Sequence, residues 1–320
     1  MATLYVDRRE AVVGYRDGAA EIRAPGGPPT HVPLRGLERI VVVGNADLSA
    51  GLLGQCWSAG VGLLVLSGRR GEPTARMVGG YHKDAAVRVE QCVASRDARA
   101  VAAFARRIVF AKLAMQARVL RRLGESRPGG RARVAPALSA IANARERLRG
   151  EPDLDVDAVR GLEGAVAAAY FGVLTGFFPP SLGFTGRRRR PPPDPVNAAL
   201  SLGYTLATFE AGRQAQIAGL DPAVGALHAL GHGRDSLALD LVEPARPLVD
   251  AWVQGLFRDR TVTADHFASA PGGGMILGKA GRRHFFAAWE SRSPALSRFL
   301  RLAAREAVRA LRARIAEPAG

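Results

Sequence analysis

The strongest constraint on the fold is a change in hydrophobic pattern near residue 97. Before this point, apolar residues come in short runs separated by Gly, Pro or charged residues, which is typical of strands. From Asp97 onward the chain is dominated by long segments rich in Ala, Leu and Arg. Their apolar residues, such as Val101, Phe104 and Ile108, recur at helical spacing. The sequence therefore predicts an α+β protein, with a small N-terminal β-rich domain followed by a larger all-α catalytic domain.

The N-terminal region predicts several strands and one helix. Residues 36–44, GLERIVVVG, contain consecutive β-branched residues and favour a buried strand, as do residues 61–67. The apolar residues within 45–60 recur at helical spacing, so this segment is expected to form a helix that ends at Gly60. Further strands are expected at residues 3–7, 11–15, 19–24, 30–34 and 74–80.

The C-terminal region predicts long helices joined by exposed loops. The start of the helix at residue 194 is well marked, because Asp194 is a good N-cap and Pro195 suits the first helical position. Helices are expected over residues 96–124, 134–150, 155–178, 194–219 and 291–317. The arginine- and proline-rich segment 183–195 and the glycine-rich segment 268–285 are expected to be loops. The predicted division is a β-rich dimerisation domain at 1–85, a linker at 86–96 and a helical domain at 97–320.

The net charge indicates a polyanionic partner. The chain of 320 residues carries 45 Lys and Arg against 29 Asp and Glu, a formal charge of +16. Such an excess bears on partners and solubility rather than on fold, and nucleic acid is its natural counterpart. The alternative is a GC-rich genome that encodes Arg wherever a surface cation is tolerated.

The chain is expected to be a cytoplasmic protein without a membrane partner. No apolar run approaches the length of about 18 residues that a spanning helix needs. The opening residues MATLYVDRRE carry charge by position 7 and lack the apolar core of a signal peptide.

A cluster of candidate metal ligands lies in residues 228–243, HALGHGRDSLALDLVE. Asp240 and Glu243 are three residues apart, so on a helix they share one face, where a cation between them would relieve their repulsion. His228 lies upstream in a loop close enough to fold back over that face. Two carboxylates and one imidazole suit Mg²⁺ or Mn²⁺. Two acids on a solvated face are the alternative, and His232 is read as an exposed loop residue.

A third acid is expected from the segment RGLEGAVAAAYF. Glu163 lies between Gly161 and Gly164, and each glycine costs a helix about 1 kcal/mol relative to Ala. That cost is understandable if something bulky approaches the backbone beside Glu163. An ordinary surface glutamate on a poor helix is the other interpretation.

Three segments, in this order and spacing, resemble the CRISPR-associated adaptation integrases, a family of metal-dependent DNA endonucleases. They are GLEGAVAAAYF, DPVNAALSLGYTL and GLDPAVGALHALGHGRDSLALDLVEPARPLVD. The N-terminal segments LERIVVVGNADLS, SAGVGLLVLSGRRG and AVRVEQ look like that family's β-domain. The resemblance extends over nearly the whole chain.

The resemblance implies a set of functional residues. Glu163, His228 and Glu243 match the family's metal ligands, and Asp240 is a fourth catalytic candidate, either as a ligand or as a support. Asn197 and Tyr204 match polar positions near the site. They are candidate DNA contacts, together with Arg187, Arg188, Arg189 and Arg190. This chain departs from the family pattern by an extra GHG before Asp240 and by Pro244, which predicts a kink at Glu243.

The family implies an activity and partners. A divalent ion, Mg²⁺ or Mn²⁺, would assist phosphoryl transfer in which the 3′-hydroxyl of a captured double-stranded DNA fragment attacks the CRISPR repeat array. It also implies a homodimer formed through the β-domain and a small ferredoxin-like companion protein. Two alternatives remain open at this point: a non-catalytic basic DNA-binding scaffold, and a metal-dependent RNA-processing nuclease.

Overall fold

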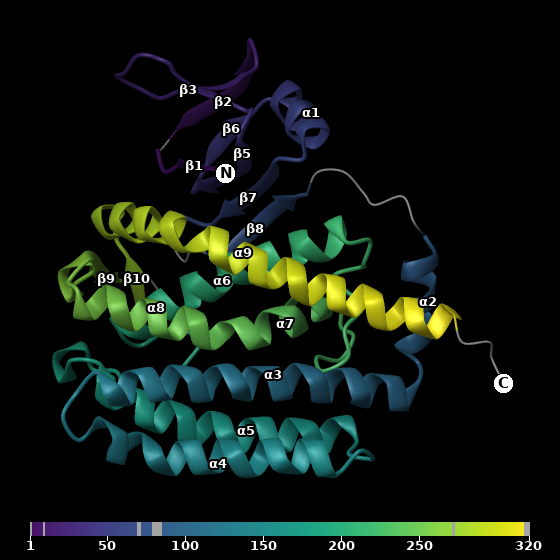
Figure 1. The fold of residues 1–320 in the computed structure, drawn as a ribbon. Coiled ribbons are helices and arrows are strands. Elements are labelled where there is room, and N and C mark those ends of the chain that lie inside the picture. The colour runs from purple at the N-terminus through teal and green to yellow at the C-terminus, as the bar shows by residue number, and fades with distance from the viewer. Residues whose placement is uncertain (1, 9, 69–71, 79–84, 271–272, 317–320) are drawn as a thin grey trace. The chain divides into compact units, whose positions relative to one another are not determined.

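The computed structural model describes residues 2–8, 10–68, 72–78, 85–270 and 273–316 (Figure 1). These form two compact units, each built from two stretches of chain. The first unit comprises Met1–Tyr81 and Val262–Ala295, and the second comprises His82–Thr261 and Leu296–Gly320. The first is rich in strands and the second is mainly helical, which confirms the expected α+β class.

The first unit contains two four-stranded sheets. In one, the order is β1-β5-β7-β8, with β1, β5 and β7 parallel and β8 antiparallel to β7. These strands are β1 (Ala2–Val6), β5 (Leu37–Val43), β7 (Gly62–Leu66) and β8 (Pro73–Met77). In the other, the order is β4-β3-β2-β6, made of β4 (Thr30–Pro33), β3 (Ala19–Arg23), β2 (Ala11–Arg16) and β6 (Ala46–Leu48).

The core of this unit depends on its β-branched strands and on helix α1 (Ala50–Ala59). Ile40 and Val42 on β5 are almost fully buried beside Leu52 and Cys56 of the helix. The side chain of Ser49 caps α1 by accepting a hydrogen bond from the amide of Leu52 at 3.2 Å. Gly60 ends the helix in the left-handed conformation at φ 69°, as the sequence predicts.

Residues 262–295 belong to the first unit, which differs from the expected division of the chain. The glycine-rich segment contains a hairpin, β9 (Phe267–Ser269) and β10 (Met275–Leu277), followed directly by helix α9 (Lys279–Ala316). A Cβ on Gly281 would lie 2.7 Å from the Cβ of His266, so this glycine permits the first turn of α9 to approach the hairpin. Polar contacts then tie α9 to β1, because Glu290 accepts hydrogen bonds from Thr3 and Tyr5.

The second unit is a helical assembly. Its helices are α2 (Ala86–Ala94), α3 (Ala98–Glu125), α4 (Gly130–Gly150), α5 (Val156–Leu174), α6 (Pro195–Ile217), α7 (Ser236–Val242), α8 (Arg246–Arg258) and the second part of α9. Short 3₁₀ turns η1 (Thr175–Phe177), η2 (Pro180–Leu182) and η3 (Glu243–Ala245) connect some of them. The expected linker at 86–96 is therefore largely helix α2. Asp194 caps α6 and Pro195 is its first residue, as predicted.

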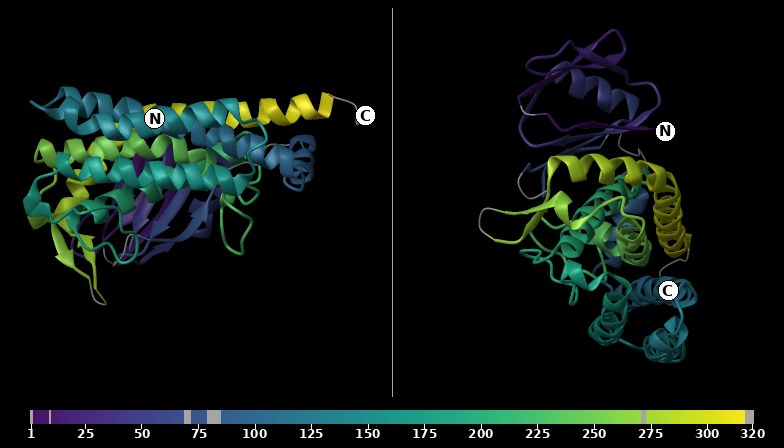
Figure 2. Two further views of the ribbon diagram at one scale, coloured as in Figure 1. Left: turned by 90° about the horizontal axis from the view of Figure 1, so that it is seen from below. Right: turned by 90° about the vertical axis from the view of Figure 1, so that its left-hand side faces the viewer.

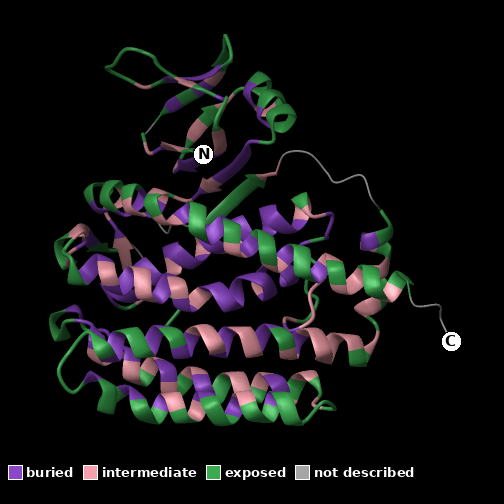
Figure 3. Cartoon of the chain, viewed as in Figure 1, coloured by how far each residue is buried: buried purple, intermediate pink, exposed green. Residues whose placement is uncertain are grey.

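Helix α3 has a central position in this unit. It packs against α4 and α5 on one side and against α7, α8 and η3 on the other (Figure 1). Both views in Figure 2 show α4 and α5 lying alongside α3. Helix α6 is buried along most of its length (Figure 3). Polar side chains on α3 therefore face two layers of helices at once, which is how the site below is assembled.

Within the described part of the chain, no helix combines the length and apolar character needed to cross a bilayer.

Candidate metal centre

The two glutamates predicted as metal ligands converge on one ammonium group. Glu163 projects from α5, and Glu243 lies in η3, directly after α7 ends at Val242. The Nζ atom of Lys112 on α3 donates a hydrogen bond to Glu243 Oε2 at 2.6 Å and another to Glu163 Oε1. The packing of α3 against α5 and η3 brings these three side chains together. Helix α7 gives way to the 3₁₀ turn η3 at Glu243, which agrees with the kink expected from Pro244.

Glu243 is held in its ionised form by surrounding cations. It is almost completely buried, and burial alone would raise its pKa. Arg246 donates from Nε to Glu243 Oε1 at 2.7 Å, and together with Lys112 it lowers the pKa of Glu243 to about 2. Burial works against the charge of Lys112, but the two glutamates outweigh it and raise the pKa of Lys112 above its ordinary value. The site is thus a buried network of charges rather than a pair of solvated acids.

Asp240 supports His228 rather than facing the glutamates. Its carboxylate is fully buried and accepts backbone hydrogen bonds from Ala226 at 2.6 Å, Leu227 at 3.1 Å and His228 at 2.9 Å. Its Oδ1 also contacts His228 Nδ1 at 2.7 Å. Because a carboxylate accepts, the ring proton belongs on Nδ1, which leaves Nε2 as the free ligand atom. His228 Nε2 lies 3.9 Å from Glu243 Oε1. All four lone-pair directions of Asp240 are used in this arrangement.

The loop that carries His228 is held from several sides. Gln91 on α2 donates from Nε2 to the carbonyl oxygens of Asp221 at 2.9 Å and Val224 at 2.8 Å. Its Oε1 accepts from the amide of Asp221 at 2.9 Å, so the whole side-chain amide is engaged. Arg160, one turn before Glu163 on α5, donates to the carbonyl oxygen of Leu227 at 2.8 Å. These contacts determine where the imidazole lies.

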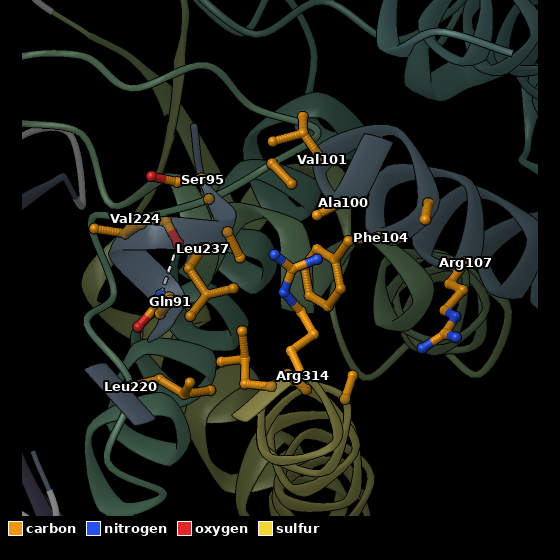
Figure 4. Close-up of a pocket in the computed structure, with 17 residues that line it drawn as sticks. Gln91, Ser95, Ala100, Val101, Phe104, Arg107, Leu220, Val224, Leu237 and Arg314 are labelled. Carbon is orange, nitrogen blue, oxygen red and sulfur yellow. Dashed lines mark hydrogen bonds between the residues drawn. The ribbon is translucent and has the colours of Figure 1, made fainter. Parts of the chain in front are cut away.

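An apolar cavity of about 210 Å³ lies behind this loop (Figure 4). Gln91, Val224, Gly225 and Leu237 line it where the loop passes, and α3 and α9 contribute the other walls. Among the described residues that line it, neither Lys112 nor the two glutamates it contacts is present, and His228 is absent as well. The cavity therefore borders the back of the His228 loop and is separate from the charged site.

Ser236 links the start of α7 to the loop that precedes it. Asp235 occupies the N-cap position, and Ser236 is the first helical residue. The hydroxyl of Ser236 donates to the carbonyl oxygen of Ala229 at 2.8 Å, so it ties α7 to the preceding loop. His232 is exposed, in agreement with its interpretation as a loop residue.

A buried carboxylate lies behind Arg246. Asp250 on α8 accepts a hydrogen bond from Tyr170 Oη at 3.0 Å and another from Tyr204 Oη. Burial raises the pKa of Asp250 to about 6, even though the two hydroxyl donors and Arg246 act in the opposite direction. The guanidinium of Arg246 lies over the ring of Tyr204, 4.6 Å from its centroid. This network holds the arginine that contacts Glu243.

Asn197 and Tyr204 lie inside the second unit, which differs from their expected role as DNA contacts. Asn197 is fully buried; its Oδ1 accepts from Arg187 at 2.9 Å, and its Nδ2 donates to Asp194 at 2.7 Å. Arg187 is turned inward over the ring of Tyr204, at 5.2 Å from the centroid. Arg188, Arg189 and Arg190 are exposed. The arginine run therefore divides into one structural residue and three surface cations.

The sequence did not indicate Lys112, Arg246, Asp250 or Gln91 as members of the site. Lys112 had one signal in its favour, because only three of the 45 basic residues are lysines. Gln91 lies in a segment read as a linker. Arg246 and Asp250 lie in the block that carries the resemblance, but their partners are distant side chains that only the packing reveals.

The donor set fits a hard divalent cation. Among the described residues, no group of three or more His, Cys, Asp and Glu side chains is arranged around a shared metal position. The Lys112 ammonium contacts both Glu163 and Glu243, so it occupies the position between them where a metal ion would lie. Two carboxylates with the Nε2 atom of His228 form the oxygen-rich set that Mg²⁺ and Mn²⁺ prefer.

Comparison with known proteins gives a consistent picture. Residues 4–291 match the family model described as CRISPR associated protein Cas1. The chain is 33% identical over 291 residues to CRISPR-associated endonuclease Cas1 1 of Thermodesulfovibrio yellowstonii, covering 91% of each protein. It shares its fold with a Cas1 protein from Thermotoga maritima, with a TM-score of 0.84, 19% identity and 97% of each chain covered. It likewise shares the fold of part of a chain in a Cas6-RT-Cas1–Cas2 complex, with a TM-score of 0.81 and 20% identity, over 98% of this chain and 35% of that one.

Replacing Gly225 by Ala is expected to destabilise the second unit by about 1–3 kcal/mol. The new Cβ would lie 2.6 Å from the carbonyl carbon of Ser236 and 2.8 Å from the amide nitrogen of Leu237, so the loop or α7 must shift. Gly164→Ala is the matched control, because its Cβ would meet no atom within 4 Å and should stabilise α5 by about 0.5–1 kcal/mol. Urea unfolding measures both; equal effects would contradict the close approach at Gly225.

Asp250 should make the folded state less stable as pH rises. Because its pKa is about 6 in the fold and about 4 when unfolded, the folded protein binds the proton more tightly. Below pH 4 this difference in pKa contributes about 3 kcal/mol to the free energy of unfolding. The contribution is lost as the pH rises from 4 to 6. Asp250→Asn should therefore become more stable relative to wild type between pH 4 and pH 7, as measured by chemical unfolding. Parallel stability curves would show that Asp250 is ionised throughout.

Proposed function

Because the chain belongs to the Cas1 family of CRISPR-associated endonucleases, we propose that it joins captured DNA fragments to a CRISPR array at a divalent-metal site formed by Glu163, His228 and Glu243. The observation that carries this proposal is the convergence of Glu163 and Glu243 on a single cationic group. An imidazole nitrogen close to Glu243 completes the set.

The burial of these charges favours a catalytic site over a structural ion pair. Taking the Glu243 carboxylate and the Lys112 ammonium out of water, and part of Glu163 with them, is costly, and well-packed apolar residues are often at least as stabilising as such a network. A protein that keeps two acids, a histidine and two cations together therefore has a use for them beyond stability. A bound Mg²⁺ or Mn²⁺ would polarise the scissile phosphate and favour ionisation of the attacking hydroxyl.

Each residue of the network has a distinct role in this proposal. Glu163 and Glu243 supply carboxylate oxygens, and His228 supplies Nε2. Asp240 orients the imidazole through Nδ1, which is a positioning role rather than that of a fourth ligand. Arg246 contacts Glu243 Oε1, so it keeps this carboxylate ionised and fixes its direction.

The substrates are double-stranded DNA on both sides of the reaction. The 3′-hydroxyl of the captured fragment would be the nucleophile, and a phosphodiester of the repeat array would be the target. The exposed side chains of Arg188, Arg189 and Arg190 would contact phosphates without reading sequence. Arg187 would act indirectly, because its contacts to Asn197 and Ser201 hold the base of this loop.

The proposal includes protein partners. The β-rich unit is proposed to form a homodimer, and the dimer is proposed to bind a small ferredoxin-like companion. A solved complex that joins a chain of this fold to Cas2 supports the second part. Two other functions remain as outcomes of the experiments below: a DNA-binding scaffold without catalysis, and a nuclease that processes RNA.

Removing one proposed ligand should abolish strand joining. Glu163→Gln and His228→Ala should each lower the rate with Mn²⁺ by about a hundredfold or more, because the metal contributes several kcal/mol to the transition state. Gel analysis of a labelled DNA fragment joined to a repeat-containing duplex measures the rate. Glu151→Gln and His232→Ala are matched controls at exposed positions and should retain activity.

The outcomes of this assay separate the candidate functions. Wild-type joining by either ligand variant would refute the proposed ligands. DNA binding without joining by the wild type would favour the scaffold, and faster cleavage of a matched RNA than of DNA would favour the RNA nuclease.

Replacing Arg188, Arg189 and Arg190 together by Ala should weaken the salt dependence of DNA binding. Each lost phosphate contact removes about 0.9 from the slope of log K against log salt concentration, so the slope should fall by about 2–3. Fluorescence anisotropy over a range of salt concentrations measures this slope. Arg258→Ala is the control, because Arg258 is an exposed arginine paired with Asp259. An unchanged slope in the triple variant would mean that these arginines are ordinary solvated charges.

A further inference from the structure

The charged site contains a lysine in a chain that almost always uses arginine. Among 45 basic residues, only positions 83, 112 and 279 are lysines. Lys279 is exposed, and Lys83 lies outside the described residues. Lys112 is buried and contacts both glutamates of the proposed metal site. The choice of lysine at this position therefore calls for a physical reason.

Arginine is the better residue for a permanent buried ion pair. Its planar guanidinium pairs with carboxylates in a fixed geometry and is more weakly hydrated than an ammonium. Arg246 shows this use in the same site, since its Nε contacts Glu243 Oε1 at 2.7 Å while its guanidinium lies over Tyr204. Lysine instead offers a compact charge on a flexible stem, which can occupy a metal-sized position and leave it again.

An alternative acceptor for this ammonium lies one turn along α3. Gln116 is four residues after Lys112, so the two side chains share a helix face. Gln116 is only 2% exposed, and within the described residues its Oε1 has no hydrogen-bond partner. A buried carbonyl oxygen without a donor is unfavourable, and proteins rarely retain one. An ammonium that moves away from the glutamates would satisfy it.

We propose that Lys112 is a displaceable counter-ion of the metal site. Without metal, its ammonium neutralises Glu163 and Glu243 and holds them together. When a divalent cation binds, the ammonium withdraws towards Gln116 Oε1 and the carboxylates bind the metal instead. This inference rests on the proposed metal ligands. It adds that the metal competes with a cation of the protein's own, so the measured affinity is lower than the donor set alone would provide.

Two substitutions of Lys112 should change metal affinity in opposite directions. Lys112→Met removes the competing charge, so the Kd for Mn²⁺ should fall by about tenfold or more. Lys112→Arg supplies a cation that pairs more rigidly with both carboxylates, so the Kd should rise by about tenfold or more. Isothermal titration calorimetry with Mn²⁺ on the full chain measures both. Lys279→Met is the matched control at an exposed lysine and should bind as the wild type does.

A purely structural lysine would give a different result. If Lys112 only supported the fold, both substitutions would weaken Mn²⁺ binding, and this outcome would overturn the proposal. Unchanged affinity in Lys112→Met would overturn it as well. Because Lys112→Met leaves the buried carboxylate of Glu243 and the half-buried one of Glu163 without their shared cation, its metal-free form should unfold at a lower temperature and gain more than the wild type from added Mn²⁺.

Gln116→Met provides a test that does not depend on the folding of Lys112→Met. The substitution keeps the volume but removes the acceptor, so displacement of Lys112 becomes costlier and the Kd for Mn²⁺ should rise by about threefold or more. The melting temperature of the metal-free protein should not fall, because Gln116 Oε1 has no partner there. Unchanged Mn²⁺ affinity in this variant would overturn the withdrawal towards Gln116.

Glu163→Gln separates this inference from the proposed function. Undiminished Mn²⁺ binding in Glu163→Gln would mean that the proposed ligands, and with them the inference, are wrong. If Glu163→Gln loses Mn²⁺ while Lys112→Met does not gain affinity, the ligands stand and only the displacement of Lys112 fails.

Discussion

The contact of the Lys112 ammonium with Glu163 and Glu243 is the interaction on which the rest of the site depends. Like charges cannot share a buried space unless cations neutralise them. Here the cations come from two directions, Lys112 from α3 and Arg246 from the start of α8. The position of α3 between two layers of helices makes this possible, because one helix can face both glutamates at once. The helical unit is thus organised around charge compensation as well as around apolar packing.

Around that contact, many polar groups hold His228 and Arg246 in place. Asp240 uses its whole carboxylate on three backbone amides and the imidazole of His228. Gln91 fixes the same loop from α2, and Asp250 with its two tyrosines lies behind Arg246. Residues that a sequence motif would group together as acids therefore do different work. One orients a histidine, one keeps an arginine in place, and two face the position of a cation.

The sequence predicted a large part of this arrangement because the signals were local. The change from strands to helices at residue 97, the cap at Asp194 and the end of α1 at Gly60 all follow from neighbouring residues. The block from His228 to Glu243 lies within sixteen residues, so its members were found together. The segment 262–295 was misplaced because its glycines resemble a loop, whereas Gly281 in fact allows α9 to pack closely against His266.

By itself, the sequence determined the fold class, the family and the acids and histidine of the candidate site, because hydrophobic period and local motifs are properties of adjacent residues. Only the tertiary structure decided which charges meet. Lys112 is 51 residues from Glu163 and 131 residues from Glu243, and no pattern along the chain relates them. Their contact exists because α3 packs against α5 and η3, and the energy of a buried charge depends on what surrounds it in space. The inward turn of Arg187 and the supporting role of Asp240 were decided in the same way.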